Sequence, residues 1–311
     1  MAIKDELNLY EIGGIGEIKN KTARFHKYRC EPDRSKAGDY LIFAVFAEEK
    51  PPVFKSGYPD GQKLLMDLCN LHLAVKDKEI QESAGKIATW CSAHIHPYYF
   101  EEDELMRYDR SEFFNEEQMD LDINWLNYFS FSCKKTLADL KALYENTVTA
   151  FTYKQLMDGN PGKAKDVYKP LLAAVGKDIC REWIDMSDAG KAERVDRFMR
   201  SLPALRMGAQ YSTEAGKLLF LPYVSSVFDS AYYALVRFIS VDAGATSDTG
   251  GKTSLGACKA CGGIFVKNGN RQIYCDNVMC QSVRNNRKAN NYYHRKKQKE
   301  IENFIEEVIM S

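Results

Sequence analysis

Residues 258–280 read CKACGGIFVKNGNRQIYCDNVMC, a stretch in which four cysteines follow the spacing C-x2-C-x13-C-x4-C. A tetrahedral zinc site takes two thiolates from a tight turn and two from a second element, at Zn–S distances of about 2.3 Å. The sequence therefore predicts one structural Zn²⁺ bound by Cys258, Cys261, Cys275 and Cys280. Four protein ligands leave no coordination position for a reacting water, so the predicted metal is not catalytic.

The residues around the two cysteine pairs predict the local fold. Gly262 and Gly263 can adopt positive φ, which turns the backbone toward the sulfurs. Residues 264–266 and 271–274 have the composition of two strands, with a hairpin turn at 267–270. Asp276 or Asn277 can cap a helix that begins there and places Cys280 in its first turn. A knuckle, a hairpin and a helix in this order predict a treble-clef-like finger.

Two disulfide bonds are the alternative use of these four cysteines. Residues 1–10 are charged and contain no apolar segment typical of a secretory signal, so we expect a cytoplasmic protein. In a reducing compartment, paired cysteines at this spacing favour zinc. The other five cysteines stand among apolar residues, and we expect them to act as small hydrophobic side chains. They are Cys30, Cys69, Cys91, Cys133 and Cys180.

Positive charge is concentrated in the same segment. Residues 258–299 contain ten Lys or Arg and one acidic residue, Asp276, whereas the whole chain has a formal net charge of zero. The rest of the chain is therefore acidic by the same amount. Such a contrast between segments favours a polyanionic partner for the finger, with a solvated charged helix as the alternative.

The predicted helix after Cys280 arranges these charges on one face. Five residues recur at i, i+3, i+4, i+7 and i+11 and so share that face: Arg284, Arg287, Lys288, Asn291 and Arg295. Arg and Lys neutralise phosphates, while Asn can bond adenine bidentately. Tyr292 and Tyr293 interrupt the basic run, and we expect them to pack against the protein, with stacking on bases as the alternative. The candidate nucleic-acid contacts are Arg271, Arg284, Arg287, Lys288, Asn291, Arg295, Lys296 and Lys297.

Residues 258–297 resemble the CGNR-type zinc fingers found at the C-terminus of bacterial proteins taken to be transcriptional regulators. The resemblance rests on both cysteine pairs, Gly263-Ile-Phe-Val, Arg271 before Tyr274 and the basic run 284–297. The Gly-Asn-Arg of that family is missing, because Gln281-Ser-Val follows Cys280. The resemblance implies that the four cysteines bind zinc and that the basic helix binds duplex DNA.

The rest of the chain predicts a mainly α fold with minor β structure. Residues 1–241 form a large, mostly helical body, a candidate ligand- or partner-sensing domain, and the apolar run 40–46 predicts a strand. Residues 242–257 are small and polar and predict a flexible linker. Helical periodicity is clearest in four stripes of apolar residues. They are 64, 68, 71, 72 and 75; 137, 140, 144, 148 and 151; 171, 175, 179 and 183; and 228, 231, 232, 235, 236 and 239.

Residues 300–311 predict the amphipathic end of the basic helix. Ile301, Phe304, Ile305, Val308 and Ile309 form one stripe and glutamates occupy the other face. We expect the stripe to dock on the body, with a homodimer as the alternative. No apolar run approaches the eighteen residues that span a bilayer, so we expect no membrane segment and a soluble protein.

These patterns predict a zinc-finger protein that binds nucleic acid, foremost a bacterial DNA-binding transcriptional regulator. RNA is an alternative ligand, since the same charges serve either polymer. Another alternative is a protein-interaction or structural zinc module on an enzyme of unknown chemistry. The best catalytic candidates are His94 and His96 near the acidic residues 101–104, but two partly buried histidines beside a solvated turn is the commoner arrangement. We therefore expect no enzymatic activity.

Overall fold

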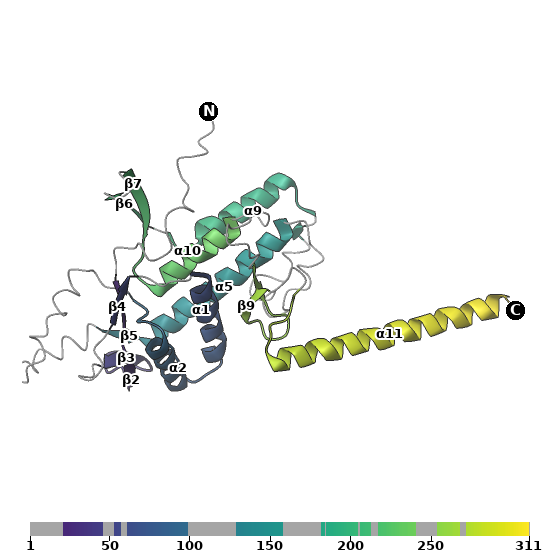
Figure 1. Ribbon diagram of the computed structural model, residues 1–311, viewed down its shortest axis with the longest axis horizontal. Coiled ribbons are helices and arrows are strands. Elements are labelled where there is room, and N and C mark those ends of the chain that lie inside the picture. Colours follow the sequence, from purple (N-terminus) through teal and green to yellow (C-terminus); the bar gives the residue numbers. More distant parts are fainter. Residues whose placement is uncertain are drawn as a thin grey trace, which may run out of the picture.

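The computed structural model describes residues 21–45, 53–56, 61–98, 129–157, 182–183, 185–204, 206–212, 217–240, 254–267 and 272–310. These residues form mostly helices, accompanied by small antiparallel sheets (Figure 1). The predicted mainly α fold with minor β structure is therefore confirmed for this part of the chain.

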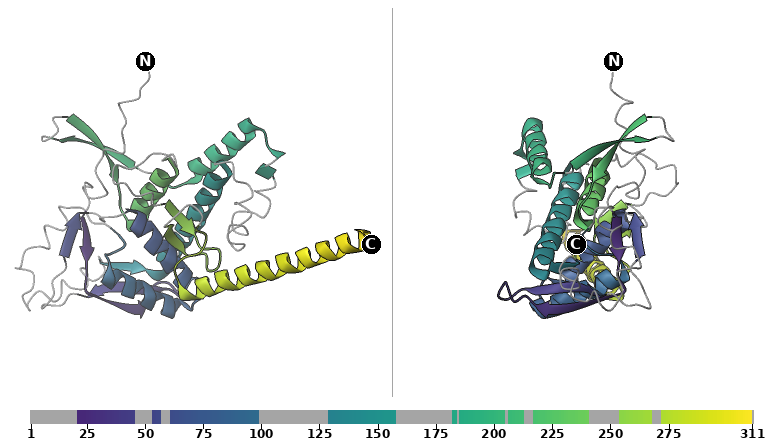
Figure 2. Two further views of the ribbon diagram at one scale, coloured as in Figure 1. Left: turned by 45° about the vertical axis from the view of Figure 1, so that its right-hand side comes forward. Right: turned by 90° about the vertical axis from the view of Figure 1, so that its left-hand side faces the viewer.

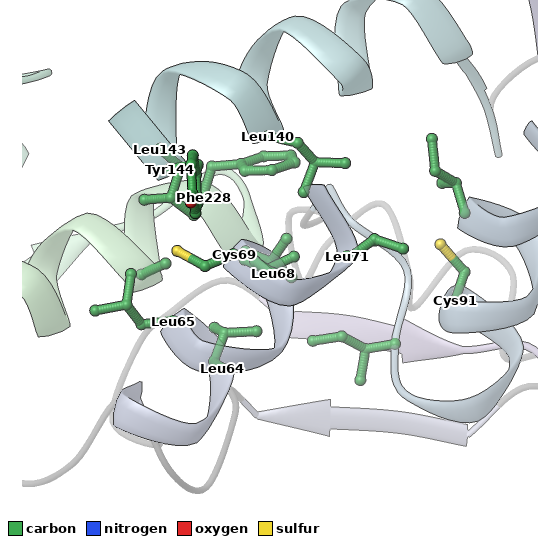
Figure 3. Packing of buried hydrophobic residues seen from close by; sticks show 14 of the residues in the cluster. Leu64, Leu65, Leu68, Cys69, Leu71, Cys91, Leu140, Leu143, Tyr144 and Phe228 are labelled. Atoms are coloured by element: carbon green, nitrogen blue, oxygen red, sulfur yellow. The ribbon is translucent and has the colours of Figure 1, made fainter. Parts of the chain in front are cut away.

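Three helices form the centre of the body: α1 (Gly61–Val75), α5 (Cys133–Met157) and α10 (Val227–Ser240). Leu64 and Leu68 of α1, Leu140 and Leu143 of α5 and Phe228 of α10 are buried in one core cluster (Figure 3). Their spacing of three and four residues follows the helical repeat, so each helix turns one apolar face inward. Of the stripe 171–183 only Trp183 is among the described residues, and it is buried against Tyr153.

A three-stranded antiparallel sheet lies at one end of this core. It has the order β2 (Lys27–Pro32), β3 (Tyr40–Val45), β5 (Ser130–Ser132), and α2 (Ile80–Ala93) packs against it. Asp39, just before β3, accepts hydrogen bonds from Ser132 Oγ at 2.6 Å and from the backbone N–H of Lys134 at 2.9 Å. Since Lys134 lies in the first turn of α5, this carboxylate joins the sheet to the helix.

Other strands form two-stranded ribbons. β1 (Lys21–Arg24) pairs with β4 (Val53–Ser56), and β6 (Arg206–Ser212) pairs with β7 (Lys217–Tyr223), both antiparallel. The β6–β7 ribbon stands between α9 (Asp188–Ser201) and α10 along the chain. The sequence predicted a mostly helical body and no strand in this region, so the ribbon corrects that expectation. Residues 206–212 contain small and polar side chains and lack the strict apolar alternation that identifies a strand.

The last element, α11 (Val278–Met310), is a single helix of 33 residues. At about 1.5 Å per residue it is about 50 Å long. It projects away from the body as an isolated rod (Figures 1 and 2). The basic helix and the amphipathic end are thus one continuous helix, as predicted, but the expected docking of the end on the body is wrong for the described residues. Among the described residues, no helix is long and apolar enough to cross a bilayer.

Candidate metal centre

The first cysteine pair lies in a turn between two paired strands. β8 (Ser254–Ala257) pairs antiparallel with β9 (Ile264–Lys267), so residues 258–263 form the connection between them. This pairing corrects two predictions. The linker 242–257 ends in a strand, and β9 pairs with that strand rather than with residues 271–274. The buried Leu255 explains the first error, because one apolar side chain among small polar residues gives little strand signal.

Backbone hydrogen bonds hold this knuckle closed. The N–H of Gly262 donates to the carbonyl of Cys258, and the N–H of Cys258 donates to the carbonyl of Gly263, both at 2.8 Å. Gly262 has φ of +76°, a region that costs an L side chain strain. The positive φ predicted for the glycines after Cys261 is therefore confirmed at Gly262. Cys261 is left on the outside of the turn, where it is exposed.

The second cysteine pair is held by the start of α11. Asn277 is the helix cap, since its Oδ1 accepts the backbone N–H of Met279 at 2.9 Å, and this places Cys280 in the first turn as predicted. Gln281 Nε2 donates to the carbonyl of Cys275 at 2.7 Å. The two halves of the site meet where the N–H of Lys259 donates to the carbonyl of Ile273 at 2.8 Å.

The four sulfur atoms form one cluster. All four Sγ atoms lie within 4.8 Å of one another, and those of Cys261 and Cys275 are 3.9 Å apart. A tetrahedral site with Zn–S bonds of about 2.3 Å requires sulfur separations of about 3.8 Å. The cysteines carry free thiols rather than disulfides. The donor set and the spacing therefore suit a single metal ion.

The surroundings of the sulfurs favour bound cations. Burial by itself raises the pKa of Cys258, but backbone N–H groups from Cys261, Cys275 and Ala260 outweigh it and the pKa is lowered from its usual value. The N–H of Cys275 points at Cys258 Sγ from 3.3 Å, and the N–H of Gly263 at Cys261 Sγ from 3.4 Å. Burial raises the pKa of Cys275 and Cys280, and the neighbouring Cys258 raises both further. A dication among the sulfurs would reverse that repulsion.

The β8–β9 hairpin that carries the first cysteine pair is attached to the body by side chains far away in sequence. Asn70 of α1 donates from Nδ2 to the carbonyl of Ile264 and accepts the N–H of Ile264 at Oδ1, both at 3.0 Å. Its amide thus pairs the outer edge of β9 as a neighbouring strand would. Tyr144 Oη of α5 donates to the carbonyl of Gly262 at 3.3 Å. Leu255 and Ile264 belong to the main core cluster, so the hairpin is part of the body's packing.

Sequence reasoning missed this attachment. Asn70 reads as the polar side of α1, and Tyr144 reads as one more member of an apolar stripe. A second omission is Tyr274, which is buried between Cys258, Phe265 and Cys280. Its hydroxyl accepts a hydrogen bond from Arg287 Nη1 at 3.3 Å, which links the finger to the basic helix. Among these three residues the sequence gives a signal only for Tyr274, an aromatic residue immediately before Cys275.

The predicted nucleic-acid residues lie on the exposed part of α11. Side chains 282–303 of this helix are exposed, which includes seven of the eight candidates, while Arg271 lies outside the described residues. Arg284 donates to Gln281 Oε1 at 3.0 Å, and Lys296 Nζ is 3.9 Å from Glu300 Oε1. Tyr292 and Tyr293 are 72% and 62% exposed, so the expectation that they pack against the protein is wrong. The helix stands clear of the described part of the body, which therefore does not cover them.

The histidine candidates do not form a shared site. His96 is buried among Phe25, Phe129 and Phe131, and its Nδ1 accepts the backbone N–H of Tyr98 at 3.2 Å. Burial lowers its pKa to about 4. His94 instead stacks on Trp90, with ring centroids 4.9 Å apart. The acidic residues 101–104 lie outside the described residues.

The other cysteines take up ordinary core positions where they are described. Cys69, Cys91 and Cys133 are buried, as predicted, whereas Cys30 is half-buried and Cys180 lies outside the described residues. Burial raises the pKa of Cys69 to about 12, so this thiol stays protonated.

Comparison with known proteins adds no relative: no family model, no curated protein and no solved structure matches the chain. The four-cysteine cluster therefore stands on its own geometry as a candidate site for one metal ion.

Proposed function

We propose that this chain is a zinc-dependent DNA-binding protein in which a structural Zn²⁺ fixes the start of a basic recognition helix. The observation that carries the proposal is the position of α11. The helix begins beside the four-cysteine cluster and carries its exposed basic face away from the body (Figure 1). The resemblance to CGNR-type fingers extends the proposal to a bacterial transcriptional regulator.

Zinc is the metal that the donor set favours. Thiolates select Zn²⁺, Cu(I) or iron–sulfur chemistry over hard cations, and an all-cysteine tetrahedral site is typical of structural zinc. Cys258, Cys261, Cys275 and Cys280 would hold the ion, and the N–H groups directed at Cys258 and Cys261 stabilise thiolate charge. The bound ion would hold the knuckle and the first turn of α11 together.

Metal content tests this part of the proposal. We expect purified protein to contain one Zn²⁺ per chain by elemental analysis, and the Cys258→Ser variant to lose it. Cys69→Ser is the matched control, because Cys69 is a buried free thiol outside the cluster. Equal zinc in both variants, or none in the unaltered protein, would refute a zinc site at the four cysteines.

Duplex DNA is the polymer that the helix fits best. An α-helix fits the major groove, and α11 presents Arg284, Lys288 and Arg295 on one exposed face with Asn291 between them. These cations would contact phosphates, while Asn291 would be placed to read a base edge. The hydrogen bond from Arg287 to Tyr274 fixes the first turns of this face relative to the metal site.

Fluorescence anisotropy with a labelled random-sequence duplex tests DNA binding. If the four cations Arg284, Arg287, Lys288 and Arg295 each neutralise one phosphate, log K should fall with log salt with a slope of about −3 to −4. Lys288→Ala should flatten the slope by about 1 unit and weaken binding to all sequences alike. Lys141→Ala, on an exposed face of α5, is the control and should change neither. Absence of binding at low salt would refute the proposal, and tighter binding to RNA helices would transfer it to RNA.

A further inference from the structure

α11 carries a second face, and of the candidate nucleic-acid contacts only Lys297 lies on it. Of its large apolar side chains, Met279, Val283, Tyr293 and Ile301 are 75%, 49%, 62% and 50% exposed. Together with three polar residues and two further apolar ones they recur at steps of three and four along the whole helix. The full set, named here the seam, is Met279, Val283, Asn286, Asn290, Tyr293, Lys297, Ile301, Phe304 and Val308.

This spacing is typical of a helix that pairs with another helix. Steps of three and four keep one face toward a partner over many turns, and Asn at such positions is used to fix register. Arg284, Lys288, Asn291 and Arg295 lie about 115° or more from the mean direction of the seam, at about 100° per residue. The seam and the basic face are therefore two separate surfaces on one rod.

The sequence of the seam determines the orientation of a partner helix of the same kind. Its aliphatic residues, Met279 and Phe304 stand at the two ends, and its polar residues stand in the middle on both sides of Tyr293. Parallel pairing in register would place Lys297 against Lys297. Antiparallel pairing places Met279 and Val283 of one helix against Val308 and Phe304 of the other. In the same register Asn290 lies against Lys297, and Asn286 lies against Ile301.

Charge along α11 leads to the same orientation. Residues 300–311 contain Glu300, Glu302, Glu306 and Glu307 and no Lys or Arg, while residues 284–299 contain seven Lys or Arg and no acid. Pairing of two C-terminal ends would bring like charges together. An antiparallel partner places its acidic end beside the basic segment.

We propose that α11 is a dimerisation helix that pairs along the seam with α11 of a second copy of this chain, in antiparallel orientation. Val278 and Met279 are exposed, so the first turn is accessible to the last turns of the partner. The two basic faces remain on the outside of the pair, related by a two-fold axis. If the proposed DNA binding holds, such a pair would suit a DNA site with two-fold symmetry.

Sedimentation of the intact zinc-loaded chain tests the pairing without DNA. We expect a dimer that dissociates at least tenfold more readily in high salt, because acidic and basic segments attract one another. Val283→Lys and Ile301→Lys should each produce monomer with unchanged zinc content. Asn285→Lys introduces the same charge on the other side of the helix and is the control that should stay dimeric. A monomer at all concentrations, or a dimer that strengthens with salt, would overturn the proposal.

Cysteine cross-linking tests the orientation. Antiparallel pairing places Val283 of one helix against Phe304 of the other, whereas within one chain these positions are about 31 Å apart along the helix. We expect a mixture of the Val283→Cys and Phe304→Cys proteins to form a disulfide-linked heterodimer on mild oxidation, and neither protein alone to form a linked pair through the new cysteine. Val283→Cys protein that links to itself, or a mixture that gives dimers with no heterodimer link, would exclude the antiparallel orientation.

Discussion

Replacement of Asn70 by alanine tests whether the metal centre and the body form one folding unit. The Asn70 side chain makes both hydrogen bonds to the backbone of Ile264, each 3.0 Å long. Ile264 is only 2% exposed, so neither backbone group finds water easily once the amide is gone. A buried polar group left unpaired costs about 1–3 kcal/mol, which gives about 2–4 kcal/mol for the pair after some relaxation.

The assay is urea unfolding of zinc-loaded protein followed by tryptophan fluorescence, together with zinc affinity measured by chelator competition. If zinc binding depends on attachment to the body, a docking free energy that is weaker by about 2 kcal/mol should weaken zinc binding about 30-fold. Asn146→Ala is the matched control, because Asn146 donates one hydrogen bond to Tyr232 Oη at 2.9 Å within the body. The free energy of unfolding of Asn146→Ala should fall by about 1 kcal/mol, and its zinc affinity should not change. If Asn70→Ala behaves like Asn146→Ala in both measurements, the finger folds independently and the reasoning fails.

Two further predictions concern the knuckle and a buried histidine. In Gly262→Ala the alanine must adopt φ near +76°, so we expect the free energy of unfolding to fall by about 1–2 kcal/mol. Zinc binding measured by chelator competition should weaken about tenfold. The control is Gly85→Ala in the open middle of α2, which should raise the free energy of unfolding by about 0.5–1 kcal/mol. A stable Gly262→Ala protein with full zinc affinity would contradict the role given to this turn. Because burial lowers the pKa of His96 to about 4, the unfolded chain binds more protons between pH 6.5 and 4, and stability should fall across that window by about 3 kcal/mol from this group. Urea midpoints at pH 7 and pH 5 should differ less in His96→Gln than in the unaltered protein, and equal differences would exclude His96 as a source.

The ligand set and the helix after it could be predicted from sequence because both depend on short spacing. Four cysteines, a glycine after the first pair and Asn277 before the helix are local signals, and the structure confirms the cluster, the turn and the cap. The attachment to the body could not be predicted in this way. Asn70 and Ile264 are 194 positions apart, and one polar residue on a helix does not indicate its partner. The strand at 254–257 could not be predicted for a similar reason. Its pairing with β9, rather than its composition, makes this segment a strand.

The attachment gives the candidate metal centre a consequence beyond local stability. α1 contacts β9 through Asn70, β9 continues from the knuckle that carries Cys261, and the sulfur cluster joins that knuckle to Cys280 in α11. With a metal ion bound among the sulfurs, these steps would give the body a continuous connection to the base of the helix. On a flexible linker the finger could keep its fold while the body changed. Docked on the core, it must follow any shift of α1, and the direction in which α11 projects would follow with it.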